Sequence, residues 1–401
     1  MLKNKNIVLG ITGGIAAYKA AELTRELVKR GASVRVIMTK NATRFVTPLT
    51  LQTLSGNPVY TDMFFLTRGC EIPHISLAQS ADIIVVVPST ANIIGKIASG
   101  VADDLLSTTI IATKAPVLIC PAMNSNMYDN PILRSNIDKL SSLGYLFVKA
   151  GDGELACKSQ GPGRLPDPED IAEEVEVVLS RKDLEGQTVL ITAGPTRESF
   201  DPVRYISNHS SGKMGYALAI MARRRGADVI LVSGPSSLPI PTGVEYVDVS
   251  SAEEMRDAVM EHLEAATVII KAAAVADYRP SVTSDSKIKK TDEGLDIRLE
   301  RTFDIISEIS DAKGSRTLVG FAMETENLVE NARKKMIVKD MDLIVANELG
   351  RPGSGFQYDT NVVKIIDRSG DIVELPLMDK IDVADRILDR VLEISVRKGE
   401  R

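Results

Sequence analysis

The chain has 401 residues, of which 44% are hydrophobic and 25% are charged, and its formal net charge is −6. This length predicts two domains or more, and the acidic balance argues against binding to nucleic acid, as does an aromatic content of 4% without tryptophan. Three cysteines, and no secretory segment or apolar run of membrane-spanning length, predict a cytoplasmic protein with no membrane partner.

The first half of the chain alternates short apolar runs with helical spacing of apolar residues. A buried parallel strand is predicted over 7–12 and a helix over 15–30, which Gly31 ends. Alternating strands and helices are typical of an α/β fold with a doubly wound parallel sheet. The further strands are expected over 33–38, 82–87 and 117–120.

A second domain of the same class is predicted after a polar linker. A helix is expected to begin within 165–168 and to run to about Ser180, and the polar segment 181–186 follows it. The strand–turn–helix pattern then starts again at 188–194. We therefore place the boundary near 183, which divides the chain into two Rossmann-like domains over 1–182 and 183–401.

The turns of the first half favour a mononucleotide over a dinucleotide. The first turn, residues 10–15, lacks the G-x-G-x-x-G pattern, and Thr39-Lys40 stands where NAD-binding proteins usually have an acidic residue. A hydroxyl and a cation suit a phosphate better, and the small polar segment 88–92 lies at a predicted strand end, where ligands of such sheets bind. FMN therefore fits better than a dinucleotide, although ordinary strand-end turns account for the first turn equally well.

Three side chains of the first half are candidates for chemistry. His74, Asn124 and Cys157 supply an imidazole, a carboxamide and a thiol, each at a predicted strand end or loop. A lone histidine is more often structural than catalytic, and a lone asparagine is more often a turn or cap residue. Cys157 differs, because the glycine-rich segments 151–153 and 161–163 flank it and make burial of its thiol difficult. The three groups together would suffice for a redox-assisted site.

The second half contains two segments suited to a nucleotide. Residues 201–215 form a polar turn that opens a helix near Gly212, and they fail the P-loop pattern. This helix N-terminus is either an anion site or an ordinary cap. A predicted strand over 268–270 leads into small residues and then Asp277, a candidate contact for a base, a ribose or Mg²⁺.

Lysines follow in two places. Lys287 lies in a polar loop with Lys289 and Lys290, where a solvated surface is the common interpretation. Lys335 and Lys339 are four residues apart and are predicted to share one face of a helix. Two like charges there mildly destabilise a helix unless an anion lies between them, which suits a triphosphate.

These segments together carry a family resemblance. Residues 1–180 resemble the flavin-dependent cysteine decarboxylases, and the whole chain is similar to the bifunctional phosphopantothenoylcysteine decarboxylase/phosphopantothenate–cysteine ligase family of coenzyme A biosynthesis. One departure is Lys158, which follows Cys157 where the family usually has glycine. The matching segments of the first half are 13–19, 73–75, 88–92, 121–124 and the loop around Cys157.

For the first half, the resemblance implies FMN as the cofactor and a decarboxylation assisted by thiol oxidation. It gives His74 a role in oxidation of the substrate thiol and Asn124 a role in binding the carboxylate that leaves. It gives Cys157 a role in protonating and reducing the ene-thiol product. The flavin contacts that we expect are Gly14, Thr39, Thr90, Ala91 and Asn92.

For the second half, the resemblance implies a CTP-dependent ligation that requires Mg²⁺. The carboxylate of 4′-phosphopantothenate would attack the α-phosphate of CTP, and the amine of L-cysteine would capture the acyl-cytidylate. Asn208 and Lys287 are the implied catalytic residues, and a homo-oligomer, a dodecamer, is the implied assembly. The implied CTP contacts are Ala272, Ala273, Asp277, Lys287, Phe303, Asp304, Ile305, Phe321, Lys335 and Lys339.

Three other functions are compatible with parts of the pattern. A two-domain nicotinamide oxidoreductase would need a G-x-G-x-x-G turn and an acidic ribose ligand, and neither first turn has them. A flavin-binding interaction protein would not need His74, Asn124 and Cys157 together. A flavin prenyltransferase shares the first-half fold, but it would account for neither the Cys157 loop nor the attached second half.

Overall fold

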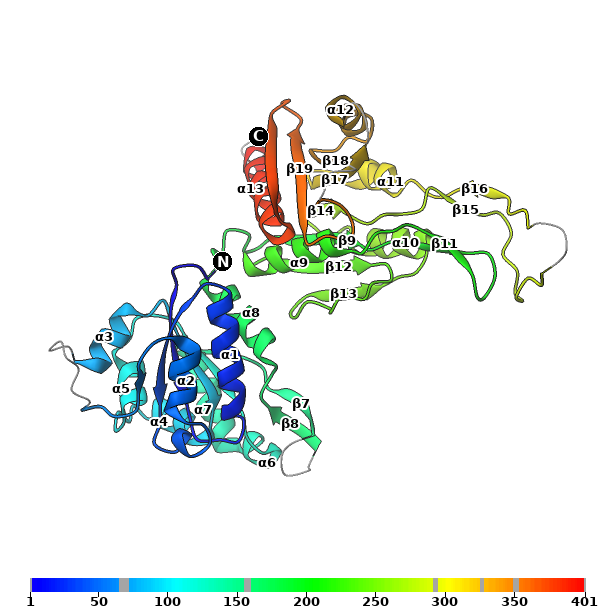
Figure 1. Cartoon of the computed structure of the whole chain (residues 1–401). Coiled ribbons are helices and arrows are strands. Elements are labelled where there is room, and N and C mark those ends of the chain that lie inside the picture. The colour runs from blue at the N-terminus through cyan, green and yellow to red at the C-terminus, as the bar shows by residue number, and fades with distance from the viewer. Residues whose placement is uncertain are drawn as a thin grey trace. The chain divides into compact units, whose positions relative to one another are not determined.

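A computed structural model describes residues 2–64, 72–154, 160–290, 295–324, 328–348 and 353–399. The chain divides into two compact units, 1–180 and 181–401 (Figure 1). Each unit is built on its own sheet with helices on both faces, so the predicted α/β class with two such domains is confirmed.

Unit 1 contains a parallel sheet with the strand order β3-β2-β1-β4-β5-β6. Its central strands are buried apolar runs, as expected for a parallel sheet that is covered on both faces. An antiparallel hairpin, β7–β8, lies outside this sheet. The strands are β1 (Asn6–Ile11), β2 (Ser33–Met38), β3 (Val59–Tyr60), β4 (Ile83–Ser89), β5 (Val117–Pro121), β6 (Leu146–Phe147), β7 (Gly151–Glu154) and β8 (Gln160–Arg164).

Two groups of helices cover the faces of this sheet. Helices α1, α2 and α8 pack on one face through residues such as Leu23 and Ile171. Helices α3, α4, α5 and α7 pack on the other through residues such as Ile94 and Leu106. Their bounds are α1 (Ala17–Lys29), α2 (Pro48–Ser55), α3 (Pro73–Ser80), α4 (Ala91–Ala98), α5 (Leu105–Ala112), α6 (Ser125–Tyr128), α7 (Pro131–Ser142) and α8 (Pro168–Leu179), with a 3-10 turn at Ala42–Arg44.

Unit 2 has a larger, mixed sheet with the order β13-β12-β9-β14-β17-β18-β19-β20. Neighbouring strands are parallel from β13 to β18, whereas β19 and β20 continue the sheet in antiparallel pairing. Figure 1 shows the β15–β16 hairpin extending away from this sheet. The strands are β9 (Thr188–Ala193), β10 (Arg197–Ser199), β11 (Tyr205–Ser207), β12 (Asp228–Ser233), β13 (Glu245–Asp248), β14 (Val268–Lys271), β15 (Tyr278–Pro280), β16 (Leu299–Arg301), β17 (Thr317–Glu324), β18 (Leu343–Glu348), β19 (Thr360–Asp367) and β20 (Ile372–Asp379).

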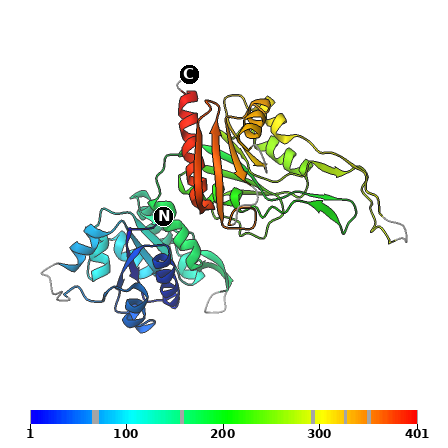
Figure 2. The ribbon, with the colours of Figure 1, turned by 45° about the horizontal axis from the view of Figure 1, so that its top comes forward.

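The helices of unit 2 also form two layers. Helices α9 and α13 pack on one face of the sheet, and Figure 2 shows the red α13 running alongside the orange strands β19 and β20. Helices α10, α11 and α12 pack on the other face. Their bounds are α9 (Lys213–Arg224), α10 (Ala252–His262), α11 (Ile305–Ala312), α12 (Leu328–Val338) and α13 (Lys380–Gly399).

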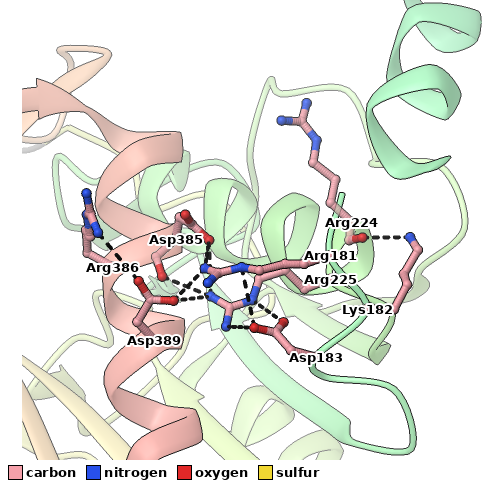
Figure 3. Close-up of polar contacts among 8 residues, drawn as sticks. All are labelled: Arg181, Lys182, Asp183, Arg224, Arg225, Asp385, Arg386 and Asp389. Carbon is pink, nitrogen blue, oxygen red and sulfur yellow. Dashed lines mark hydrogen bonds and ion pairs between the residues drawn. The ribbon is translucent and has the colours of Figure 1, made fainter. Parts of the chain in front are cut away.

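A buried arginine ties the start of unit 2 to its two long helices. Arg225 caps the C-terminus of α9 and is fully buried, and its guanidinium contacts Asp183 (2.8 Å), Asp385 (3.1 Å) and Asp389 (3.0 Å) (Figure 3). Arg181 reaches the two carboxylates on α13 as well. The segment that precedes β9 is therefore held against α9 and α13 by charge-assisted hydrogen bonds.

Replacing Arg225 with methionine is expected to lower the free energy of unfolding of unit 2 by about 2–3 kcal/mol, because it leaves three partly buried carboxylates with only the more exposed Arg181 as their shared cation. We set this value below that of a fully buried pair, since the carboxylates keep some access to water. The matched control is Arg386→Met on α13, where the exposed arginine lies 3.7 Å from Asp389 and should contribute less than about 0.5 kcal/mol. Thermal denaturation of the two variants measures the difference, and equal midpoints would contradict this account.

Candidate active sites

A cavity of about 710 Å³ lies at the carboxyl ends of the strands of unit 1. The turn after β1 contributes Gly13 and Gly14, and the start of α4 contributes Ala91. Two helices, α1 and α4, therefore begin at this cavity, and helix N-termini offer N–H groups and a positive dipole end to an anion. The volume and this donor set fit a phosphorylated mononucleotide such as FMN.

Threonine hydroxyls join the first turn to the start of α4. The hydroxyl of Thr12 donates to the carbonyl of Pro88 (2.7 Å) and accepts from the backbone N–H of Thr90 (3.2 Å). Thr90 lines the cavity, and Thr12 is buried behind it. These bonds fix the relative position of two turns that are 76 to 78 residues apart in the chain.

The segment that carries Asn124 borders the same cavity, as does the β7–β8 hairpin. Asn124 caps the short helix α6, where its side-chain oxygen accepts from the backbone N–H of Asn126 (2.9 Å). Met123 donates its N–H to the carbonyl of Gly163 in β8 (3.0 Å). A Cβ at Gly163 would lie 2.3 Å from the carbonyl oxygen of Met123, and its φ is +119°, so this close approach requires glycine.

The predicted residues of the first half are not all brought together. Gly14, Thr90, Ala91 and Asn124 line the cavity, whereas Thr39, Asn92 and His74 are not among its lining residues. Thr39 accepts from the N–H of Ala42 and so stabilises the 3-10 turn instead. Cys157 and Lys158 lie outside the described residues.

His74 is the second residue of α3, and its Nδ1 is a buried atom without a hydrogen-bond partner in the part of the chain that the structure describes. Such a group needs a partner to offset its desolvation, which is consistent with a ligand or a further chain at this position.

Sequence reasoning missed several cavity residues. Lys19 donates to the carboxylate of Asp167 (2.8 Å) and the carbonyl of Leu165 (3.3 Å), which attaches α1 to the segment before α8. Glu154, the last residue of β7, and Arg164, the last residue of β8, line the cavity too. Lys19 and Arg164 lie far apart in the sequence, and no motif marks them as neighbours.

A second cavity, of about 310 Å³, lies at the carboxyl ends of the strands of unit 2. It gathers the small residues after β14, the turn that precedes α9, and part of β17. Gly212 caps α9 with a left-handed φ of +83°, so the predicted polar turn does open a helix at the cavity. Of the predicted nucleotide contacts, it is lined by Ala272, Ala273, Asp277, Phe321 and Lys335.

Four lysines face this cavity, and only one had been singled out from the sequence. Besides Lys335, these are Lys213, Lys271 and Lys380. Burial and, to a lesser extent, the charge of Lys335 lower the pKa of Lys271 to about 8. Burial also lowers the pKa of Lys380 to about 8. A surplus of cations at a strand-end cavity favours an anionic ligand.

The other predicted nucleotide contacts have partners within the protein. Lys339 follows the last residue of α12 and binds the carboxylate of Asp304 and the hydroxyl of Ser307 (2.8 Å). Although α12 ends one residue before Lys339, the N–H of Lys339 donates to the carbonyl of Lys335 (3.0 Å), so the two lysines lie one helical turn apart as predicted. Asp304 caps α11, and Ile305 is a buried core residue of the same helix. Phe303 packs against the guanidinium groups of Arg256 and Arg279.

Asn208 lies at a third cavity, of about 840 Å³, which shares Ser210 and Ser211 with the second one. Its side-chain amide donates to the carbonyl of Ala274 (2.9 Å) and so links the polar turn to the segment after β14. Lys287 is exposed in the segment between β15 and β16 and lines neither cavity.

Within the described ranges, no group of three or more His, Cys, Asp or Glu side chains is arranged to hold a metal ion. Asp277, the candidate Mg²⁺ contact, is exposed at the edge of the second cavity. Among the helices described, none has the length and apolarity needed to cross a membrane.

Comparisons with known proteins cover the whole chain. Residues 1–180 match the Flavoprotein family, and residues 184–394 match the family described as DNA/pantothenate metabolism flavoprotein C-terminal domain. The coenzyme A biosynthesis bifunctional protein CoaBC of Bacillus subtilis (strain 168) is 50% identical over 405 residues, with 100% of both chains covered. The chain belongs to the CoaBC family.

Other members of the CoaBC family are similarly close. A solved structure of the C-terminal domain of a CoaBC protein is 44% identical and covers 53% of this chain and 97% of its own, with a TM-score of 0.46. The CoaBC protein of Escherichia coli (strain K12) is 45% identical over 405 residues, again with 100% of both chains covered. These full-length matches confirm the family resemblance stated from the sequence.

Proposed function

We propose that this CoaBC-family chain carries out two consecutive reactions of coenzyme A biosynthesis. Unit 2 joins 4′-phosphopantothenate to L-cysteine at the expense of CTP, which releases CMP and pyrophosphate. Unit 1 decarboxylates the product, 4′-phosphopantothenoylcysteine, to 4′-phosphopantetheine. The observation that carries the proposal is full-length similarity to bifunctional relatives in a chain with a strand-end cavity in each unit.

In unit 1, the first turn and the start of α4 would hold FMN through Gly14, Thr90 and Ala91. When bound, FMN supplies the electron sink that oxidises the substrate thiol and so makes loss of CO₂ possible. The carboxamide of Asn124 would bind the carboxylate that leaves, and the imidazole of His74 would orient the thiol and accept its proton. Glu154, which ends β7 and lines the cavity, precedes Cys157 by three residues in the sequence, and this supports a role for Cys157 as the proton donor to the ene-thiol.

In unit 2, the mechanism must turn a poor electrophile, the carboxylate of 4′-phosphopantothenate, into a reactive one. Its attack on the α-phosphate of CTP forms the acyl-cytidylate and expels pyrophosphate, and the cysteine amine then displaces CMP. Lysines such as Lys335, with Mg²⁺ near Asp277, would neutralise the charge on the phosphates. Asn208 would bind the acyl-cytidylate, and Lys287 would approach the nucleotide from the exposed segment that carries it.

Incubation of the flavin-loaded protein with 4′-phosphopantothenate, L-cysteine, CTP and Mg²⁺, followed by mass spectrometry, tests the proposal. We expect CTP-dependent appearance of 4′-phosphopantetheine, with 4′-phosphopantothenoylcysteine as the intermediate. Absence of both products from folded, flavin-loaded protein would refute the proposal and favour a flavin-binding interaction module. Size-exclusion chromatography with light scattering would separately test the proposed dodecamer.

A further inference from the structure

Lys271 is one of the four lysines that line the unit 2 cavity. It ends β14 at the carboxyl edge of the sheet, where strands β9 and β17 flank it in register at Thr192 and Gly320. Ligands of open α/β sheets bind at this edge. Lys271 is half-buried, and the small residues Ala272 and Ala273 follow it along the cavity wall.

The other lysines of this cavity have hydrogen-bond partners. Lys213 binds Asp359 (2.7 Å) and the carbonyl of Gln357 (2.8 Å). Lys380 donates to the carbonyl of Gly355 (2.8 Å), and Lys335 donates to the carbonyl of Phe321 (3.3 Å). For the Lys271 ammonium, no such partner is found among the residues that the structure describes.

We propose that the Lys271 ammonium binds the phosphate chain of the nucleotide, as a second cation of the cavity beside Lys335. The inference rests on the proposed use of CTP by unit 2, and it adds a residue that sequence reasoning had passed over. An ammonium in a half-buried cavity with a second ammonium nearby is costly unless an anion compensates both charges. A triphosphate supplies that anion, whereas cytosine and ribose are uncharged.

The lowered pKa of Lys271 allows binding of the nucleotide to be followed by the uptake of protons, independently of enzyme activity. Burial and Lys335 hold its pKa down to about 8, and Lys339 lowers it as well, whereas Asp304 and Asp277 act in the opposite direction. An anion next to the ammonium raises this pKa again. At pH 8 the empty site is therefore partly deprotonated, and binding of the nucleotide takes up protons. Lys380 has a similar pKa, so the contribution of Lys271 must be isolated with variants.

Calorimetric titration of CTP and cytidine into the flavin-loaded full chain at pH 8 tests the inference, with Mg²⁺ present and with two buffers of different ionisation enthalpy. Lys271→Met should weaken CTP binding about tenfold or more, because a hydrogen bond to a charged group is lost. Cytidine binding should change less than about twofold, and the proton uptake should fall. The matched control is Lys334→Met, an exposed lysine of α12 that pairs with Glu330.

A second variant keeps the test decisive if Lys271→Met does not fold. Lys271→Arg retains a cation that stays protonated at pH 8, so it should bind CTP with much of the wild-type affinity but with less proton uptake. Unchanged proton uptake in Lys271→Arg would overturn the inference, as would equal losses of CTP and cytidine affinity in Lys271→Met. Absence of CTP binding to the wild-type protein would instead refute the proposed function itself.

Discussion

Replacing Asn124 with aspartate is expected to slow decarboxylation of 4′-phosphopantothenoylcysteine by at least about 100-fold, the scale seen when one donor to a developing or bound anion is removed. Asparagine and aspartate cap helices about equally well, so the new carboxylate would still accept from the N–H of Asn126 and keep α6 in place. What changes is the charge, because a carboxylate repels the substrate carboxylate that the carboxamide is proposed to bind. Release of CO₂ from supplied 4′-phosphopantothenoylcysteine measures the effect.

Asn130→Asp is the matched control for this variant. Asn130 caps α7 with the same geometry, accepting from the N–H of Ile132 (2.9 Å), but it does not line the cavity. It should leave both activities near those of the wild type. Ligation by unit 2 should also survive Asn124→Asp. Wild-type decarboxylation in Asn124→Asp, or equal losses in the two variants, would contradict the proposal that Asn124 binds the substrate carboxylate.

The fold class was predictable because its signals are local. The apolar run over 7–12 could only be a buried strand or part of a buried helix, and the glycines that follow it favour a strand that ends in a turn. The observed β1 spans Asn6–Ile11, and α1 follows it at Ala17. The antiparallel strands β19 and β20 were not foreseen, because their direction depends on pairing with β18 rather than on their own residues.

The cavities were predicted only in part, and the misses share one physical cause. Strand ends such as Ala272 and turns such as Gly14 are marked by small residues in the sequence. By contrast, the pairing of Lys339 with Asp304 joins residues 35 apart, and only the packing of α12 against α11 brings them together. The same holds for Lys271, whose surroundings come from β9, β17 and α12. Spacing along one helix correctly placed Lys335 at the cavity. It could not show that the ammonium of Lys339 is already bound to Asp304 and Ser307.

Replacing Asn208 with aspartate is expected to impair ligation in unit 2 and to leave decarboxylation in unit 1 intact, which is the reverse of the effect expected for Asn124→Asp. The side-chain amide of Asn208 donates to the carbonyl of Ala274, and an aspartate there removes the donor and sets a carboxylate against that carbonyl oxygen. The polar turn before α9 would then lose a link to the segment after β14, at a position that borders the proposed acyl-cytidylate. We expect ligation to fall by at least about 100-fold, measured as pyrophosphate release from CTP.

Decarboxylation of supplied 4′-phosphopantothenoylcysteine should be unchanged in Asn208→Asp, since Asn208 belongs to unit 2. The matched control is Gln187→Glu, which adds the same charge to unit 2 but keeps the acceptor that Thr267 uses (2.8 Å), away from both cavities. Loss of both activities in folded Asn208→Asp would contradict a two-site enzyme. If instead the two aspartate variants, mixed in solution, regained product formation from 4′-phosphopantothenate, the intermediate must pass between chains, because each variant supplies the site that the other lacks.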